Sequence, residues 1–159
     1  MFKQLMLIAF LFTGLVACKS KSAFNYSEAI TAKDKSLEID VKATEDKVSK
    51  YGAAQQFDSV AIAGENMEKI VQQKIDEINA LAVPKAKGAE EFKAAALTYF
   101  KFIKSLYTGY KNAGNAKTDE ERQAIVTELQ QIVGEKQKIL SDMQAAQRKY
   151  AEANGFKVQ

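Results

Sequence analysis

The side chains that most often perform covalent catalysis are nearly absent from this sequence. It contains one cysteine, Cys18, and no histidine, so the commonest general base and the commonest neutral metal ligand are both missing. Ser-His-Asp and Cys-His arrangements, and the Glu-x-x-His pairs that hold di-iron sites in helical bundles, are therefore excluded. No Ser-x-x-Lys sequence and no glycine-rich phosphate loop occurs. The sequence predicts a protein with no catalytic site, no metal and no cofactor.

Carboxylates are the remaining side chains that could hold a metal ion. The acids on the predicted helices are accompanied by lysines three or four residues away, which indicates exposed helix faces that carry ion pairs. An all-carboxylate site would need several of them to point inward together. We expect them to lie in solvent instead; they are Glu65, Glu68, Glu77, Glu128 and Glu135.

The segment from residue 89 to residue 117 has an unusual mixture of aromatic and basic side chains. After Glu91 it contains no acid, and three of its lysines fall within about 20° of one another on a helical wheel. One interpretation is that this helix touches two neighbours, so that its apolar arc is wide and its lysines reach out to water. The other is an exposed patch that binds an anionic lipid, an acidic glycan or an acidic partner. Its residues would be Lys93, Phe100, Lys104, Tyr107 and Lys111.

Lys136 interrupts the apolar stripe of the last predicted helix. Its ammonium group either reaches water at the edge of the helix interface or pairs with a buried acid that fixes the helix register.

The N-terminal segment has the composition of an export signal. Lys3 is followed by an apolar run from Leu5 to Phe12, which is too short to span a bilayer, since a spanning helix needs about 20 residues. It has the length of the apolar part of a secretory signal peptide. We therefore expect residues 1–17 to be removed. The alternatives are an ordinary signal peptide cut near Ala17, or a buried structural role for Cys18.

Leu15-Val16-Ala17-Cys18 resembles the lipobox of bacterial lipoproteins, and Cys18 is the only cysteine of the chain. The resemblance implies cleavage before Cys18, a thioether-linked diacylglycerol on its sulfur and acylation of the new amino group. Two or three acyl chains anchor a protein essentially permanently. Lys19 stands where an Asp would be the inner-membrane retention signal of enteric bacteria, so the resemblance favours the outer membrane, on its periplasmic or surface face. We expect residues 18–25 to form a short polar tether.

Length and charge allow one ordinary domain after the leader. The chain has 159 residues, a net charge of +3 and 47% hydrophobic residues, which is typical of a globular protein. The charge is too small to indicate nucleic-acid binding. With a single cysteine the domain must be held together by packing and not by disulfide bonds.

Apolar residues recur every three or four positions through most of the mature chain, so we predict an all-α fold. The expected architecture for residues 26–159 is an up-down-up-down antiparallel four-helix bundle with left-handed, coiled-coil-like packing. An elongated assembly of helical hairpins is the alternative. The expected helices cover residues 26–51, 58–83, 89–113 and 119–154.

Two functions fit these predictions. The first is a membrane-anchored, non-enzymatic binding or structural module of the cell envelope, with an envelope protein as its partner. The second is a helical bundle that carries a lipid or another hydrophobic ligand near the aromatic residues of 89–113. A cavity of several hundred Å³ between the helices expected at 89–113 and 119–154 would favour the second. The domain is loosely similar to helical surface lipoproteins of the leptospiral type, in length, lipobox and helix pattern only. Whether it self-associates is left open.

Overall fold

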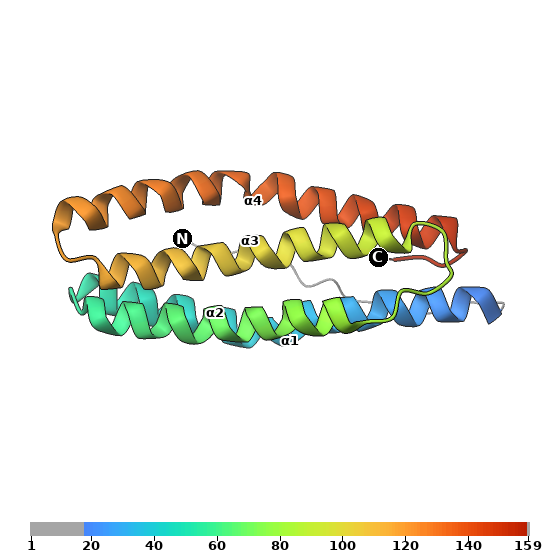
Figure 1. Cartoon of the computed structure of the whole chain (residues 1–159), viewed down its shortest axis with the longest axis horizontal. Coiled ribbons are helices and arrows are strands. Elements are labelled where there is room, and N and C mark those ends of the chain that lie inside the picture. Colours follow the sequence, from blue (N-terminus) through green and yellow to red (C-terminus); the bar gives the residue numbers. More distant parts are fainter. Residues whose placement is uncertain (1–17, 159) are drawn as a thin grey trace.

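The computed structural model describes residues 18–158, and this part of the chain contains helices and no strand. The predicted leader, residues 1–17, lies outside the described residues. The prediction of an all-α domain with four helices is confirmed. Figure 1 shows the helices side by side along one long axis, with the connections between them at the two ends. They are α1 (Cys18–Ala53), α2 (Phe57–Ala80), α3 (Ala89–Asn115) and α4 (Asp119–Ala153).

The first helix begins earlier than its sequence pattern predicts. α1 starts at Cys18, so the segment 18–25, predicted as a tether, is helical. Tertiary packing explains the difference, because the ring of Phe24 contacts that of Phe156 edge-on, with centroids 5.7 Å apart. A polar segment without an apolar stripe of its own is thus held in a helix by the C-terminal end of the chain.

The other helices begin and end close to their predicted bounds. α2 ends at Ala80, before the predicted residue 83, because Leu81 adopts an extended conformation (φ −62°, ψ 124°) ahead of Pro84. At the start of α4 the Thr118 side chain accepts a hydrogen bond from the backbone N–H of Glu121 at 3.1 Å, which is one half of a capping box. The Glu121 carboxylate returns to the N–H of Lys117 and not to that of Thr118.

Glycines bring the backbones of α2 and α3 into direct contact. A Cβ on Gly64 would lie 2.6 Å from the backbone N of Lys111, and a Cβ on Gly114 would lie 2.4 Å from the backbone N of Ala61. Only a residue without a Cβ fits at such separations. α2 and α3 accordingly share the most extensive contact among the helix pairs.

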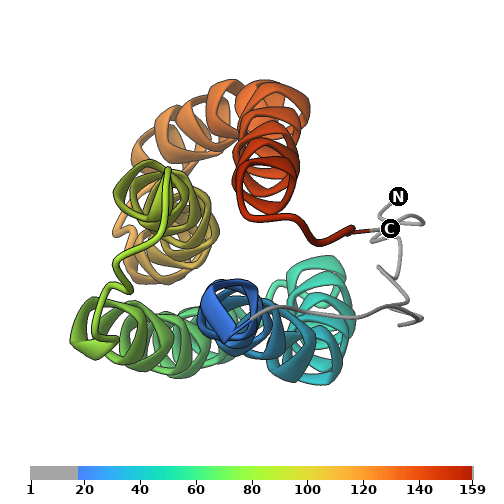
Figure 2. The same cartoon turned by 90° about the vertical axis from the view of Figure 1, so that its right-hand side faces the viewer.

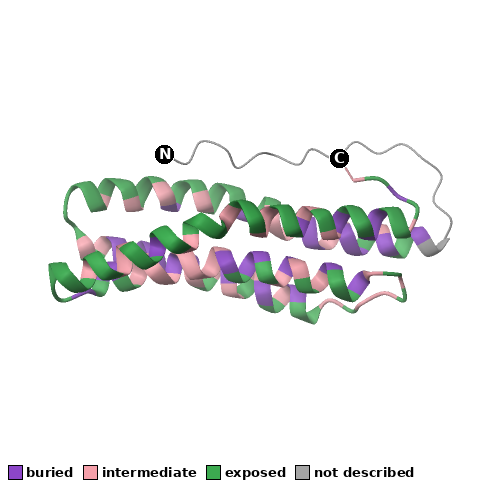
Figure 3. Ribbon diagram, turned by 90° about the horizontal axis from the view of Figure 1, so that it is seen from above, coloured by how far each residue is buried: buried purple, intermediate pink, exposed green. Residues whose placement is uncertain are grey.

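Packing is uneven around the bundle. α3 contacts both α2 and α4 extensively and α1 packs mainly on α2, whereas α1 has few contacts with α4 or α3 (Figure 2). Buried residues are concentrated toward the end where α1 begins and α4 ends, as the purple segments of Figure 3 show. In α4 the buried residues are Leu129, Met143, Gln147, Tyr150 and Ala151.

Polar contacts between helices show how the helices are in register. Between α2 and α3, Lys111 bonds Glu68 and Lys93 bonds the carbonyl of Leu81. A residue later in the α2 segment is thus paired with a residue earlier in α3. Between α1 and α3 both partners advance together: Tyr99 bonds Asp34, and eleven residues later Tyr110 bonds Glu45.

Candidate functional site

The predicted basic and aromatic patch is not formed as one exposed surface. Phe100 is fully buried and Tyr107 is 2% exposed, so the patch hypothesis is wrong for both of them. The reason is the position of α3, which packs on α2 and on α4 and therefore turns a wide apolar arc inward. The other interpretation, a wide buried arc edged by lysines, agrees with the structure.

The three lysines of that prediction lie along the seam between α2 and α3, where each binds an acceptor on α2. The Lys93 ammonium donates to the carbonyls of Asn79 (2.9 Å) and Leu81 (3.0 Å), and so caps the C-terminus of α2. Lys104 donates to Oε1 of Gln72 at 2.7 Å. These lysines are occupied in joining two helices.

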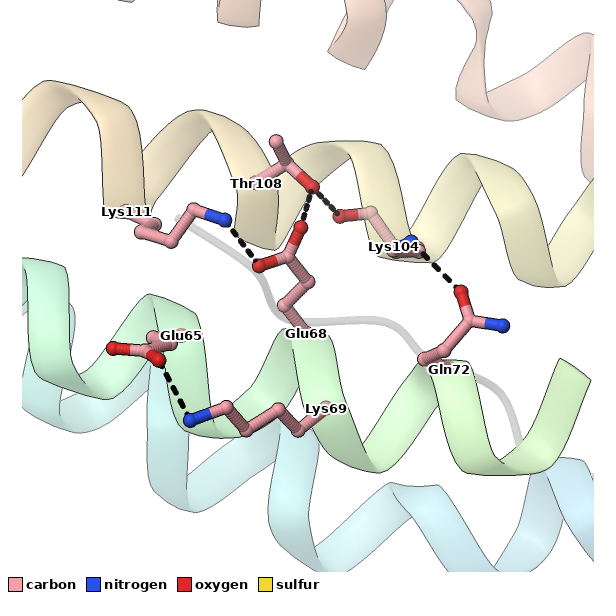
Figure 4. A network of polar contacts seen from close by, with 7 residues as sticks. All are labelled: Glu65, Glu68, Lys69, Gln72, Lys104, Thr108 and Lys111. Carbon is pink, nitrogen blue, oxygen red and sulfur yellow. Dashed lines mark hydrogen bonds and ion pairs between the residues drawn. The ribbon is translucent and has the colours of Figure 1, made fainter.

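Glu68 is the centre of this seam, as Figure 4 shows. Its carboxylate accepts hydrogen bonds from the Thr108 hydroxyl at 2.6 Å and from the Lys111 ammonium at 2.5 Å. Burial alone would raise the pKa of Glu68, but the hydrogen bonds from Lys111 and Thr108 outweigh it and lower that pKa. The acid is therefore held ionised at the seam. Its neighbour Glu65 pairs with Lys69 at 2.6 Å on the outer face of α2.

Two half-buried acids of α1 form hydrogen bonds with tyrosines of α3. The Tyr99 hydroxyl donates to Asp34 at 3.0 Å, and the Tyr110 hydroxyl donates to Glu45 at 3.2 Å. Burial raises the pKa of both carboxyls, although the tyrosine hydrogen bonds act in the opposite direction. Burial, together with the neighbouring carboxylate charge, also raises the pKa of both tyrosines. We call these two contacts the tyrosine–carboxylate pairs.

Lys136 acts on one of these pairs. After burial and the hydrogen bonds from Tyr107 and Tyr110, its positive charge is a further influence on the pKa of Glu45, which it lowers. The charge of Lys136 on α4 thus acts on a half-buried acid of α1.

The tyrosine–carboxylate pairs could have been found from spacing alone. Asp34 and Glu45 are eleven residues apart, as are Tyr99 and Tyr110, and eleven residues make about three helical turns. Equal spacing of complementary groups on two helices indicates that the helices meet along a common face. The pattern of α1 alone does not reveal this contact, and the equal spacing on α3 is the signal that relates the two helices.

A hollow of about 360 Å³ lies between α3 and α4. Its α4 wall is mainly apolar, with Ile125, Leu129 and Ile132 beside one acid, Glu128. Its α3 wall is mostly polar: Lys101, Lys104, Ser105, Thr108, Gly109 and Asn112. At its base Leu129 packs so closely on α3 that a Cβ on Gly109 would lie 2.3 Å from its side chain. The hollow therefore has one mainly apolar wall and one wall of hydrogen-bonding groups.

Residues 18–158 contain no group of three or more His, Cys, Asp or Glu side chains placed to hold a metal ion. No helix in this part of the chain is both long and apolar enough to cross a bilayer.

Comparison with known proteins gives no relative. No protein-family model matches the chain, and no curated protein and no solved structure is significantly similar to it.

Proposed function

We propose that this chain is an exported lipoprotein whose residues 1–17 are removed and whose Cys18 carries the lipid anchor. The observation that carries the proposal is the sequence Leu15-Val16-Ala17-Cys18, which follows an apolar run of secretory length and contains the only cysteine of the chain. The first residue of α1 is this same Cys18. Acyl chains on it would hold the helical domain directly at a membrane surface, which we propose is that of the outer membrane.

We further propose that the mature domain is an up-down-up-down antiparallel bundle acting as a non-enzymatic binding or structural module of the envelope. The register of the contacts supports this topology, since the partners of α2 and α3 move in opposite directions and those of α1 and α3 move together. The sequence supports a non-enzymatic role, because it supplies neither a histidine base nor a free thiol once Cys18 is acylated.

Mass spectrometry of the protein isolated from its own membrane tests the anchor. We expect a chain that begins at residue 18 and carries a diacylglyceryl group on sulfur, with a further acyl group on the new amine. The matched control is Cys18→Ser, which has no thiol to acylate and should therefore carry no diacylglyceryl group at residue 18. An unmodified sulfur, or a wild-type chain that still begins at Met1, would contradict the proposal.

Crosslinking in the native envelope tests the binding role. We expect crosslinks from the exposed surface of the described helices to one recurring envelope component. A domain that is anchored but reproducibly crosslinks to no other component would contradict it.

The hollow between α3 and α4 favours a second function, the carriage of a lipid or another hydrophobic ligand. Its volume of about 360 Å³ lies at the lower end of the range for small-molecule sites, about 300–1,000 Å³. An acyl chain would lie on Ile125, Leu129 and Ile132, and a polar head would meet the hydrogen-bonding groups of α3.

The absence of tryptophan from the chain makes this alternative easy to test. Ile132→Trp places a fluorophore in the wall of the hollow, and Val133→Trp, at an exposed neighbouring position, is the matched control. If a fatty acid binds in the hollow, the emission of the first variant shifts to the blue and that of the second does not. Identical responses of the two variants would exclude the hollow as the binding site.

A further inference from the structure

Several separate segments meet at the end of the bundle where α1 begins (Figure 1). The start of α1 is joined to the C-terminal segment by the contact between Phe24 and Phe156. The connection between α2 and α3 is joined to the end of α4, because the Asn154 amide donates to the carbonyl of Lys87 at 2.9 Å. We call this region the anchor end. It comprises residues 18–28, 79–95 and 147–158.

The anchor end holds an excess of positive charge. Its three segments contain eight Lys or Arg and four Glu residues, whereas the rest of the chain after residue 18 contains fourteen Lys or Arg and sixteen Asp or Glu. The four acids are Glu28, Glu90, Glu91 and Glu152. The positive charge of the mature domain is therefore confined to one end, and the remainder is slightly acidic.

The lysines of this end are available to an external partner. Five of them are exposed, four of these outside α4, and within residues 18–158 none of the four forms an ion pair. They are Lys21, Lys85, Lys87 and Lys157. They come from α1, from the connection between α2 and α3 and from the C-terminal segment, so they surround the end and do not line one helix face.

We propose that the anchor end docks on the anionic headgroups of the membrane that holds the lipid anchor. The proposal rests on the proposed lipidation of Cys18, which would bring this end and no other to the bilayer. A lysine beside an anionic surface strengthens binding about fivefold. The attraction fades within about 10 Å at moderate salt, whereas the 36 residues of α1 extend for about 54 Å. The bundle therefore stands with its far end away from the membrane.

Vesicle binding by a chain that begins at residue 19 tests the docking surface apart from the anchor. The described core cluster involves no residue before Ala23, so this chain retains it. We expect binding to phosphatidylcholine vesicles that contain about one-third phosphatidylglycerol, and none to pure phosphatidylcholine. Sodium chloride at about 0.5 M should abolish the binding.

Charge reversal at the four lysines should weaken this binding by more than about tenfold. A matched control reverses four exposed lysines elsewhere, with the same change in net charge: Lys47→Glu, Lys50→Glu, Lys101→Glu and Lys117→Glu. The control should bind within about threefold of the wild type. Circular dichroism checks that both variants remain helical.

Two results would overturn the inference: equal loss of binding in both variants, or equal binding of the wild type to anionic and neutral vesicles. Because the tested chain lacks Cys18, neither result bears on lipidation. The mass of the native protein decides that question separately.

Discussion

Replacing Gly114 by alanine tests the close approach between the backbones of α2 and α3. The added Cβ would lie 2.4 Å from the backbone N of Ala61 and 2.5 Å from the backbone O of Phe57. Both are backbone atoms of α2 and cannot rotate away, so the two helices must separate along part of their seam. Overpacking of this kind costs about 1–3 kcal/mol, and a rigid contact belongs near the upper value. Alanine returns about 1 kcal/mol through its higher helix propensity. We expect a net loss of about 2 kcal/mol in the free energy of unfolding.

Gly134→Ala is the matched control. Gly134 lies inside α4, and a Cβ there would meet no atom within 4 Å. Only the propensity gain remains, so this variant should be more stable than the wild type by up to about 1 kcal/mol. Urea unfolding followed by circular dichroism should separate the two variants by about 3 kcal/mol, with unchanged dependence on urea.

Equal stability of the two variants would refute the reasoning, because it would mean that α2 and α3 do not approach as closely as Gly114 implies. Gly64→Ala provides an independent check from the facing helix. Its Cβ would lie 2.6 Å from the backbone N of Lys111, so it should be destabilised to a similar extent.

Four further substitutions probe the interior and the far end of the bundle. Tyr99→Phe removes the hydrogen bond to Asp34 and should lower the unfolding free energy by about 1–2 kcal/mol. Tyr150→Phe, whose hydroxyl bonds no described atom, should change it little, and the reverse order in urea titrations would contradict both assignments. Burial raises the folded-state pKa of Glu45, so its contribution to stability is present at acid pH and lost as the pH rises through that pKa. Glu45→Gln should therefore match the wild type at acid pH and exceed it at neutral pH in thermal melts, whereas a difference independent of pH would argue against this. The Arg122 guanidinium donates to the carbonyls of Ala113 and Ala116 and stacks 3.7 Å above the Phe57 ring. Arg122→Lys should lose about 1–2 kcal/mol in the same urea assay, and an unchanged midpoint would show that the ammonium replaces these contacts.

Helix content and most boundaries could be predicted from sequence because α3 and α4 repeat their apolar residues with a regular period. A helical wheel, however, does not show how many other helices pack against a given helix. Phe100 and Tyr107 lie beside aligned lysines on the wheel of α3, and only its packing against both α2 and α4 shows that these rings face inward. The direction in which a side chain points from its helix follows from the sequence of that helix. Whether the side chain is buried depends on which other helices pack against it.

The features that sequence reasoning missed all join distant parts of the chain. α1 begins at Cys18 because Phe24 meets Phe156, and no pattern within residues 18–25 reveals that contact. The hollow between α3 and α4 depends on where Leu129 meets Gly109. Such contacts are set by the spacing between helices, which a periodic pattern leaves undetermined.

The concentration of buried residues near the anchor end implies that the domain does not open all at once. From the start of α4 to Met143, only Leu129 is buried among the residues of that helix. Beyond Met143, stacked and edge-on rings hold Tyr150 against Phe92 and Tyr26. Segments with few buried apolar contacts unfold locally at low free energy. Amide protons in the first half of α4 should therefore exchange with solvent before those near Tyr150. We therefore expect the helices to be held together most firmly at the anchor end and to separate first at the opposite end.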